Sequence, residues 1–371
     1  MKYMKMAAIA LMALMLFSCN NKKNEPNVEA SALSIRIDDA QLRAIEGAIA
    51  DGTETNITKN VTIKLIPSGR EIDLDAAQIA AAKTTAGARI TVGEVVEKVS
   101  IVKANAEITD ATKIVDWQGK KDVFTTDIPL TAPETAVTPS TEGKNTIYTV
   151  ELQPVPAFAR VEVAGDIEAG NGGEFPKNAD GKSAYKSIKV EQVYMNNYLE
   201  TRAGDRVYCA GKAGKFVTAP HGNMCDEIVD AKQANFKDFK EVAGYQLFPI
   251  KDGELASEHS YYDHIILRLT VEYDTTVAKG YPATPQTRYV TMVRFMKDGT
   301  GDLKSFEAGM IYKLDLKELT KDFTTDDKGN PTGPDTPDPE QDGKHILVVK
   351  VDAFKWTAVN IKPDINDGYK K

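Results

Sequence analysis

The sequence has few of the residues that usually carry enzymatic or metal chemistry. Among 371 residues there are only three cysteines and four histidines. His221, His259, His264 and His345 match no spacing of a zinc site, and the chain has no GxSxG, no P-loop and no GxGxxG after a strand. We therefore expect a protein that is not an enzyme and that holds no metal or other cofactor.

Positive charge is also scarce. The formal net charge is −8, with 54 acidic residues against 46 Lys and Arg, and no basic stripe alternates with aromatic residues. An acidic surface of this kind repels nucleic-acid backbones and anionic lipid. We expect no nucleic-acid partner.

Long apolar runs are absent after the first residues. Residues 1–18 combine Lys2 and Lys5 with the apolar stretch Met6–Phe17. This stretch is too short to span about 30 Å of hydrocarbon as a permanent helix. Residues 1–18 therefore form a secretory signal peptide, and the protein is exported.

The end of this signal, Leu16-Phe17-Ser18-Cys19, is similar to a bacterial lipobox. That resemblance implies that Cys19 is lipidated, with acyl chains such as palmitate, after cleavage before it. The polar stretch Asn20–Asn27 would then be a tether to the outer membrane, since several acyl chains anchor more firmly than one. The alternative is an ordinary signal followed by a chance cysteine.

Two cysteines remain in the rest of the chain, Cys209 and Cys225. Both lie in a stretch without clear periodicity. In an oxidising compartment they would form a disulfide, while in the protein of an anaerobic organism they would stay as two thiols. The sequence leaves both possibilities open.

Short segments with alternating apolar residues make up most of the chain. In "ALSIRI" (32–37), Leu33, Ile35 and Ile37 alternate with polar residues, and similar segments recur up to "MIYKLDLKEL" (310–319). Short strands separated by turns predict β-sandwiches rather than a parallel α/β sheet. Pro154 and Pro156 suggest a division into domains at 44–154 and 155–321, with a few short helices, one of them in the alanine-rich stretch 75–88.

The C-terminal part has an unusual order. Residues 322–343 are rich in Pro, Gly and Asp, which predicts a flexible spacer. The stretch "KHILVVKVDAFKW" (344–356) follows, and it alternates as Leu347, Val349, Val351 and Ala353 before it closes on Trp356. A strand at the end of a spacer either returns to its own sheet or joins the sheet of another molecule.

A further feature lies in the loop after the first strand, where Arg43 precedes Ala44. An arginine in an exposed loop is where a trypsin-like protease cuts. Together with Cys19, "ALSIRI", "IVKANAEI" (101–108), "AFARVEV" (157–163), "GMIYKLDLKEL" (309–319) and the closing strand, this pattern resembles the fimbrillins, the major structural subunits of type V pili in Bacteroidales bacteria.

The resemblance implies two tandem transthyretin-like Greek-key sandwiches and a defined maturation. The precursor would lose residues 19–43, the lipidated propeptide with its first strand (Leu33, Ile35, Ile37), to an Arg-specific protease that cuts between Arg43 and Ala44. The groove left behind would accept residues 344–371 of a neighbour as a donor strand, through Leu347, Val349, Val351, Ala353 and Trp356. Donor-strand addition supplies ladder hydrogen bonds and burial of alternate side chains.

The implied partners are other copies of the chain, accessory pilus subunits and surface ligands on host or bacterial cells, in an extracellular fimbria. The stretch 168–300 fits the family pattern least. Its many tyrosines suggest the alternative, a surface lipoprotein that does not polymerise or a tip adhesin that binds glycan or host protein; these are Tyr185, Tyr194, Tyr198, Tyr208, Tyr245, Tyr261 and Tyr262.

Overall fold

The computed structural model describes most of the two predicted domains and parts of the C-terminal segment. The described residues are 32–37, 57, 59–84, 87–118, 128–142, 145–167, 175–204, 206–207, 224–228, 230–249, 263–292, 294–297, 301–302, 306–337, 347–351, 354–355 and 360–365. Cys19, Arg43, Ala44, Cys209, Ala353 and Trp356 lie outside these ranges, so their roles stay predictions.

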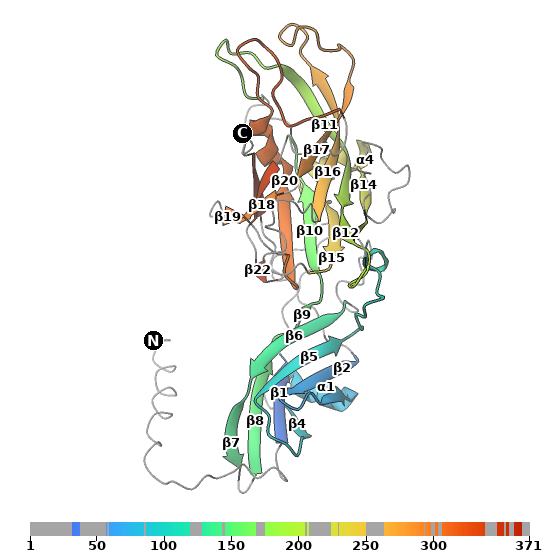
Figure 1. The fold of residues 1–371 in the computed structure, drawn as a ribbon, viewed down its shortest axis with the longest axis vertical. Coiled ribbons are helices and arrows are strands. Elements are labelled where there is room, and N and C mark those ends of the chain that lie inside the picture. Colours follow the sequence, from blue (N-terminus) through green and yellow to red (C-terminus); the bar gives the residue numbers. More distant parts are fainter. Residues whose placement is uncertain are drawn as a thin grey trace, which may run out of the picture.

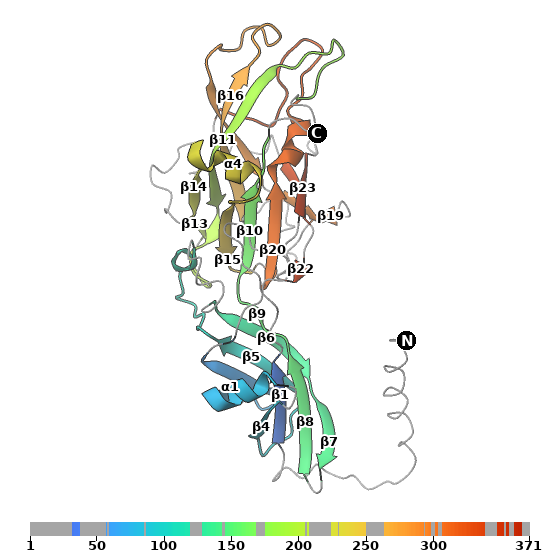
Figure 2. The same cartoon turned by 180° about the vertical axis from the view of Figure 1, so that it is seen from behind.

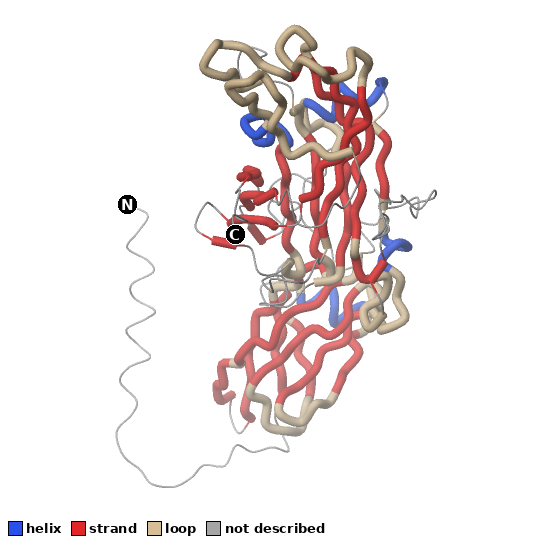
Figure 3. The backbone as a smooth tube through the Cα atoms, turned by 45° about the horizontal axis from the view of Figure 1, so that its top comes forward, coloured by secondary structure: helices blue, strands red, loops and turns tan. Residues whose placement is uncertain are grey.

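Two β-sandwiches stand end to end along the long axis of the molecule (Figures 1 and 2). Strands make up most of the described chain, and the helices are few and short (Figure 3). The prediction of a mostly β chain with two tandem sandwiches is confirmed.

The N-terminal domain packs a four-stranded sheet, in the order β4-β1-β8-β7, against a five-stranded sheet, in the order β3-β2-β5-β6-β9. A short helix, α1 (Ala76–Ala82), connects β3 to β4 and begins with a capping box between Asp75 and Gln78. The strands are β1 (Ala32–Ile37), β2 (Val61–Ile66), β3 (Glu71–Leu74), β4 (Ala88–Thr91), β5 (Lys98–Ala104), β6 (Leu130–Ala136), β7 (Thr138–Glu142), β8 (Asn145–Leu152) and β9 (Val155–Pro156).

The C-terminal domain packs a sheet in the order β15-β10-β20-β23-β21-β18-β19 against a second in the order β14-β11-β16-β17. Helix α4 (Asp230–Lys237) connects β14 to β15, and the 3₁₀ helix η3 (Leu316–Asp322) follows β20. The strands are β10 (Ala159–Ala164), β11 (Tyr185–Asn196), β12 (Tyr198–Leu199), β13 (Arg206–Val207), β14 (Cys225–Glu227), β15 (Ala243–Leu247), β16 (His264–Tyr273), β17 (Gln286–Met292), β18 (Arg294–Lys297), β19 (Gly301–Asp302), β20 (Met310–Asp315), β21 (Leu347–Val351), β22 (Phe354–Lys355) and β23 (Asn360–Ile365).

A segment of the N-terminal domain reaches onto the C-terminal domain. It contains the 3₁₀ helix η2 (Ile114–Trp117) and ends at Gln118, whose buried side-chain amide donates to the carbonyl of Gln246 at 2.7 Å and accepts from its N–H at 2.9 Å. Beside it, the rings of Trp117 and Phe158 lie 5.6 Å apart. The Gln118 amide thus occupies the outer edge of β15 as a neighbouring strand would.

The observed domain boundary differs slightly from the predicted one. Val155 and Pro156 form β9, which pairs with Thr131 and Leu130 in the N-terminal domain. The division therefore comes after Pro156, and not between residues 154 and 155, because Val155 and Pro156 still belong to a sheet of the first sandwich.

The prediction of a flexible spacer over 322–343 is wrong for its described part, residues 322–337. Phe323 is fully buried and its ring lies 5.4 Å from that of Tyr185, edge to face. Thr325 accepts a hydrogen bond from the N–H of Ala184, and Thr336 pairs with Tyr289 through two backbone hydrogen bonds. Composition suggested that nothing here packs, but one aromatic residue and a few side-chain acceptors are enough to attach the segment to the end of the domain.

Candidate strand-exchange site

The first strand is a central member of its sheet. β1 pairs parallel with β8 over Ala32–Ile37, and it pairs antiparallel with β4 over Ala32–Ile35. Without β1, the facing edges of β4 and β8 would be two strand spacings apart, about 10 Å, and both would have unpaired backbone groups. The place of β1 is therefore a strand-shaped gap between β4 and β8.

Two side chains of β1 enter the core of the N-terminal domain. Leu33 and Ile35 are both 0% exposed. By register, Leu33 lies between Ile90 of β4 and Tyr148 of β8, and Ile35 lies between Ala88 and Val150, all of which are buried. The alternation predicted for "ALSIRI" is confirmed at these two positions; Ile37 is opposite Leu152 in the register, and its side chain lies outside the described part.

Burial of this size holds the strand firmly. Removing two large aliphatic side chains from water stabilises by about 1.5–3 kcal/mol each. Each ladder hydrogen bond adds about 1 kcal/mol net. The burial of Leu33 and Ile35 and the pairing with two strands both contribute to holding β1 in its sheet.

The connection of β1 to the remainder of the domain passes through one segment. The next described residue after Ile37 is Ile57, which is 1% exposed, and Arg43 lies between them in the sequence. A single cut after Arg43 would therefore convert β1 from part of the chain into a non-covalently bound peptide.

The predicted donor strand lies in the C-terminal domain of its own chain. β21 pairs parallel with β18 and antiparallel with β23, and β23 pairs parallel with β20. Leu347, Val349 and Val351 are opposite Ile365, Pro363 and Ile361 of β23. Of the two possibilities that the sequence left open, the single chain adopts the return to its own sheet.

The strand ladder of the tail is interrupted between β21 and β22. β21 ends at Val351, and the next two paired residues, Phe354 and Lys355, form β22 against Ile311 and Met310 at the start of β20. The chain then returns as β23. The tail is thus a β-hairpin with a short extra bridge, and sequence reasoning did not anticipate that Asn360–Ile365 is a strand beside β20.

The point where the tail leaves the domain is fixed by Asp335. Its two carboxylate oxygens accept from the hydroxyls of Tyr185 and Tyr273, each at 2.9 Å, and its side chain is only 5% exposed. Arg288 approaches the same carboxylate at 3.6 Å and donates to Tyr273 at 3.1 Å. Sequence analysis counted Asp335 only as one more spacer acid, because nothing in "GPDTPDPE" indicates that this acid alone meets two buried tyrosines.

The two tyrosines of this cluster are hard to ionise. Burial above all, and then the charge of Asp335, raise the pKa of Tyr185 and that of Tyr273 well above their usual range. Both hydroxyls therefore stay protonated and donate to Asp335 over the whole physiological pH range.

The described tyrosines of the stretch 168–300 that suggested a binding surface are not exposed. Tyr185, Tyr194, Tyr198 and Tyr245 are each 5% exposed or less and belong to the core. Tyr208, Tyr261 and Tyr262 lie outside the described residues. The tyrosines that motivated the adhesin alternative are, where described, packing residues.

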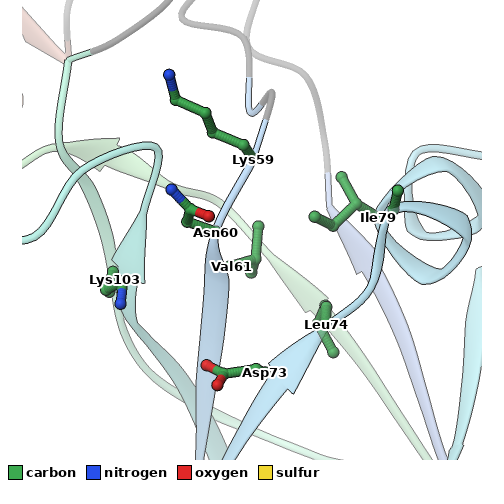
Figure 4. A pocket seen from close by; sticks show the side chains of 8 residues that line it. Lys59, Asn60, Val61, Asp73, Leu74, Ile79 and Lys103 are labelled. Carbon is green, nitrogen blue, oxygen red and sulfur yellow. The ribbon is translucent and has the colours of Figure 1, made fainter.

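A cavity of about 380 Å³ opens beside α1 in the N-terminal domain (Figure 4). Three of its side chains are charged, and Val61, Leu74 and Ile79 supply apolar surface. The described lining includes no histidine, cysteine or serine; it consists of Lys59, Asn60, Val61, Asp73, Leu74, Ala76, Ile79 and Lys103.

Other site predictions meet the described residues only in part. Cys225 is half-buried at the start of β14, opposite Tyr194, while its predicted partner Cys209 lies outside the described part, so the disulfide stays a prediction. Within the described ranges, no three His, Cys, Asp or Glu side chains come together as a metal site would require. The helices of the described chain are all too short or too polar to cross a bilayer.

Comparison with known proteins gives similarities of fold. No family model and no curated protein matches the sequence. A crystal structure described as a cell adhesion protein from Parabacteroides distasonis is similar at 12% identity and a TM-score of 0.46, covering 90% of this chain and 98% of that one. A fimbrilin from Porphyromonas gingivalis is similar at 13% identity and a TM-score of 0.43, covering 90% and 99%.

A third similar structure is described as a cell adhesion protein from Bacteroides eggerthii, at 13% identity and a TM-score of 0.39, covering 91% and 99%.

Proposed function

We propose that this chain is a structural subunit of a fimbria that polymerises by exchange of β-strands and supports adhesion. The observation that carries the proposal is the position of β1: a strand near the chain start fills a gap between β4 and β8 and buries Leu33 and Ile35 completely. Its only connection forward in the sequence contains Arg43. Such a strand protects the groove until a protease releases it.

In this proposal the precursor is exported as a lipoprotein on Cys19 and reaches the outer membrane. An Arg-specific protease cuts between Arg43 and Ala44, and residues 19–43 leave with the lipid. The mature subunit then has an apolar groove whose edges, β4 and β8, lack their shared partner.

The tail of a neighbouring copy is the proposed donor. β21 and β23, with the short β22 between them, are the last strands of the longer sheet in chain order, and the segment before them is attached through Asp335 at the end of the domain. Leaving β18 and β20 and entering the groove of the next copy, the tail would link subunits head to tail, and such a heterologous contact yields an open filament.

The test uses the full chain without its signal peptide, treated with a trypsin-like protease. We expect cleavage after Arg43, followed by a ladder of polymer bands when the samples are run on a gel without boiling. The subunits in these bands would be held together by exchanged strands and not by covalent bonds. Arg43→Gln should stop both events, whereas Arg202→Gln, at an exposed arginine of the C-terminal domain, should change neither. Clean cleavage after Arg43 without any polymer would refute the proposal.

Protein taken from cells offers an independent measurement. The proposal expects a mature N-terminus at Ala44. An N-terminus at lipidated Cys19 would instead favour a surface lipoprotein that does not polymerise.

A further inference from the structure

The two sandwiches share one plan, although the sequence shows no repeat. One sheet of each domain contains the strand order β3-β2-β5-β6 in the N-terminal domain and β14-β11-β16-β17 in the C-terminal domain, with antiparallel pairs throughout. Their other sheets contain β4-β1-β8 and β15-β10-β20, where in each case the first strand of the domain is antiparallel to one neighbour and parallel to the other. Helices α1 and α4 occupy equivalent places in the chain order.

The correspondence continues through a strand that changes sheets. In the N-terminal domain, β6 ends at Ala136 in one sheet, and β7 begins at Thr138 in the other. In the C-terminal domain, β17 ends at Met292 in one sheet and β18 begins at Arg294 in the other. By position and by this crossing, β18 is the counterpart of β7, and β20 is the counterpart of β8.

At this place the two domains differ. β7 pairs directly with β8, antiparallel, from Thr138↔Thr149 to Glu142↔Asn145. β18 and β20 do not pair with each other in the described sheet, because β21 and β23 lie between them. Across these four strands, Lys297 of β18 pairs with Val351 of β21, Val351 pairs with Ile361 of β23, and Ile361 pairs with Leu314 of β20.

The strand directions permit direct pairing of β18 with β20. β18 is parallel to β21, β21 is antiparallel to β23, and β23 is parallel to β20. β18 therefore runs antiparallel to β20, as β7 runs to β8. The linking segment 298–309 is long enough to span the shift, since twelve residues reach about 40 Å when extended and β18 has to move about 10 Å, two strand spacings.

We propose that the C-terminal hairpin β21–β23 is an insertion into a sheet that closes behind it: when the tail leaves, β18 pairs with β20 as β7 pairs with β8. This inference rests on the proposed function, because assembly into a fimbria is the event that removes the tail from its own domain. Closure replaces the ladder that β20 loses to the departing tail, so an edge strand is not left open to pair with further chains. The domain thus has one sheet order for storage of the tail and another for its donation.

The experiment follows amide hydrogen exchange by mass spectrometry in the full chain with Val349→Pro and Lys350→Pro. Proline in the interior of a strand removes ladder donors, and two successive residues direct their N–H groups to opposite neighbours, here β18 and β23. A matched control places Asp342→Pro and Gly343→Pro ahead of β21, where the tail strands should be unaffected.

We expect residues 347–365 of the variant to exchange as unstructured chain does, which shows that the tail has been displaced. Residues 294 and 295, which have no partner in β19 in the register, should nonetheless exchange at least about tenfold more slowly than unstructured chain, because they now pair with β20. Strand β10 reports on the integrity of the domain.

Two results would overturn the inference. Rapid exchange at residues 294 and 295 with a protected β10 would mean that the gap stays open. Rapid exchange in β10 as well would mean that the domain needs its tail and has no closed alternative. Neither result depends on polymerisation, so failure of the fimbrial proposal in the protease assay is distinguishable from failure of closure.

Discussion

At the scale of single residues, a few polar side chains decide which parts of the chain are held together. Asp335 holds the segment before the tail by accepting hydrogen bonds from two buried tyrosine hydroxyls. Gln118 joins the domains because its side-chain amide makes the two hydrogen bonds that a neighbouring strand would make to Gln246. Buried polar groups of this kind are costly to leave unpaired, which makes each contact specific. Neither residue differs in the sequence from many other Asp and Gln residues.

The tyrosines around Asp335 predict a loss of stability at alkaline pH. Because the folded chain raises the pKa of Tyr185 and Tyr273, the unfolded chain releases these two protons first, near pH 10. Their contribution to the free energy of unfolding is thus fully present below about pH 10 and declines above it.

This decline can be measured by urea unfolding between pH 8 and pH 11. The double variant Tyr185→Phe with Tyr273→Phe should be less stable than wild type at pH 8, since it loses the two hydrogen bonds to Asp335 and those that the hydroxyls accept from Gly333 and Arg288. It should, however, lose less stability from pH 8 to pH 11. Tyr281→Phe, a change in a half-buried ring 4.9 Å from that of Tyr273, is the matched control and should keep the wild-type slope. Parallel slopes in all three proteins would contradict the assignment.

At the scale of elements, β1 and the tail hairpin behave differently from their neighbours. β10, the counterpart of β1 in the C-terminal domain, is followed within the chain by the remainder of its own sandwich, and all six of its residues are buried. β1 occupies the same place, but only the segment around Arg43 links it onward. In the proposed function, the same architectural position is permanent in the C-terminal domain and replaceable in the N-terminal domain.

Weakening β1 should speed its replacement. Ile35→Ala removes a fully buried side chain between Ala88 and Val150, which should lower the stability of the uncut chain by about 2–5 kcal/mol. After cleavage the cut strand should dissociate sooner, so polymers should form faster than in wild type.

The measurement is the rate at which polymer appears after protease treatment, together with urea unfolding of the uncut chain. Thr141→Ala in the fully exposed strand β7 serves as the control and should change neither quantity. A slower appearance of polymer in a chain that still folds would show that loss of β1 does not limit assembly.

At the scale of the whole molecule, the domains are joined by more than a linker. Besides the Gln118 contacts, the backbone of Ile114 donates to the carbonyl of Glu200 at 2.9 Å, and Lys113 lies 3.2 Å from the Glu200 carboxylate. A subunit that transmits tension along a filament needs a defined angle between its domains. The contacts of residues 113–118 with the C-terminal domain fix this angle on one side of the junction.

Loss of this contact should loosen the junction without unfolding either domain. Gln118→Ala removes both hydrogen bonds to Gln246, and we expect a larger radius of gyration and a broader distance distribution in small-angle X-ray scattering. Asp110→Ala, at an exposed position ahead of the same segment, is the control. An unchanged scattering curve in Gln118→Ala would show that the apolar contact of Trp117 with Phe158 is sufficient to fix the arrangement.

Periodicity and composition alone determined the mostly β character, the two sandwiches and the strands with clear alternation, β1 among them, because burial of one sheet face imposes a period of two. They did not predict β7, whose residues "TPSTE" are polar and fully exposed, or β4, which begins at the last residue of the alanine-rich stretch 75–88, where the helix stops at Ala82. They also misjudged 322–337, where scattered contacts replace a regular pattern.

Only the tertiary structure decided which strands are neighbours. It placed β1 between β4 and β8, and it placed the tail between β18 and β20. Pairing joins residues more than a hundred positions apart, and no local pattern encodes the partner of a strand, because backbone hydrogen bonds are the same for every sequence. The alternation of "KHILVVKVDAFKW" specified that it is a strand, whereas the sheet it enters depends on which edges the rest of the fold leaves open.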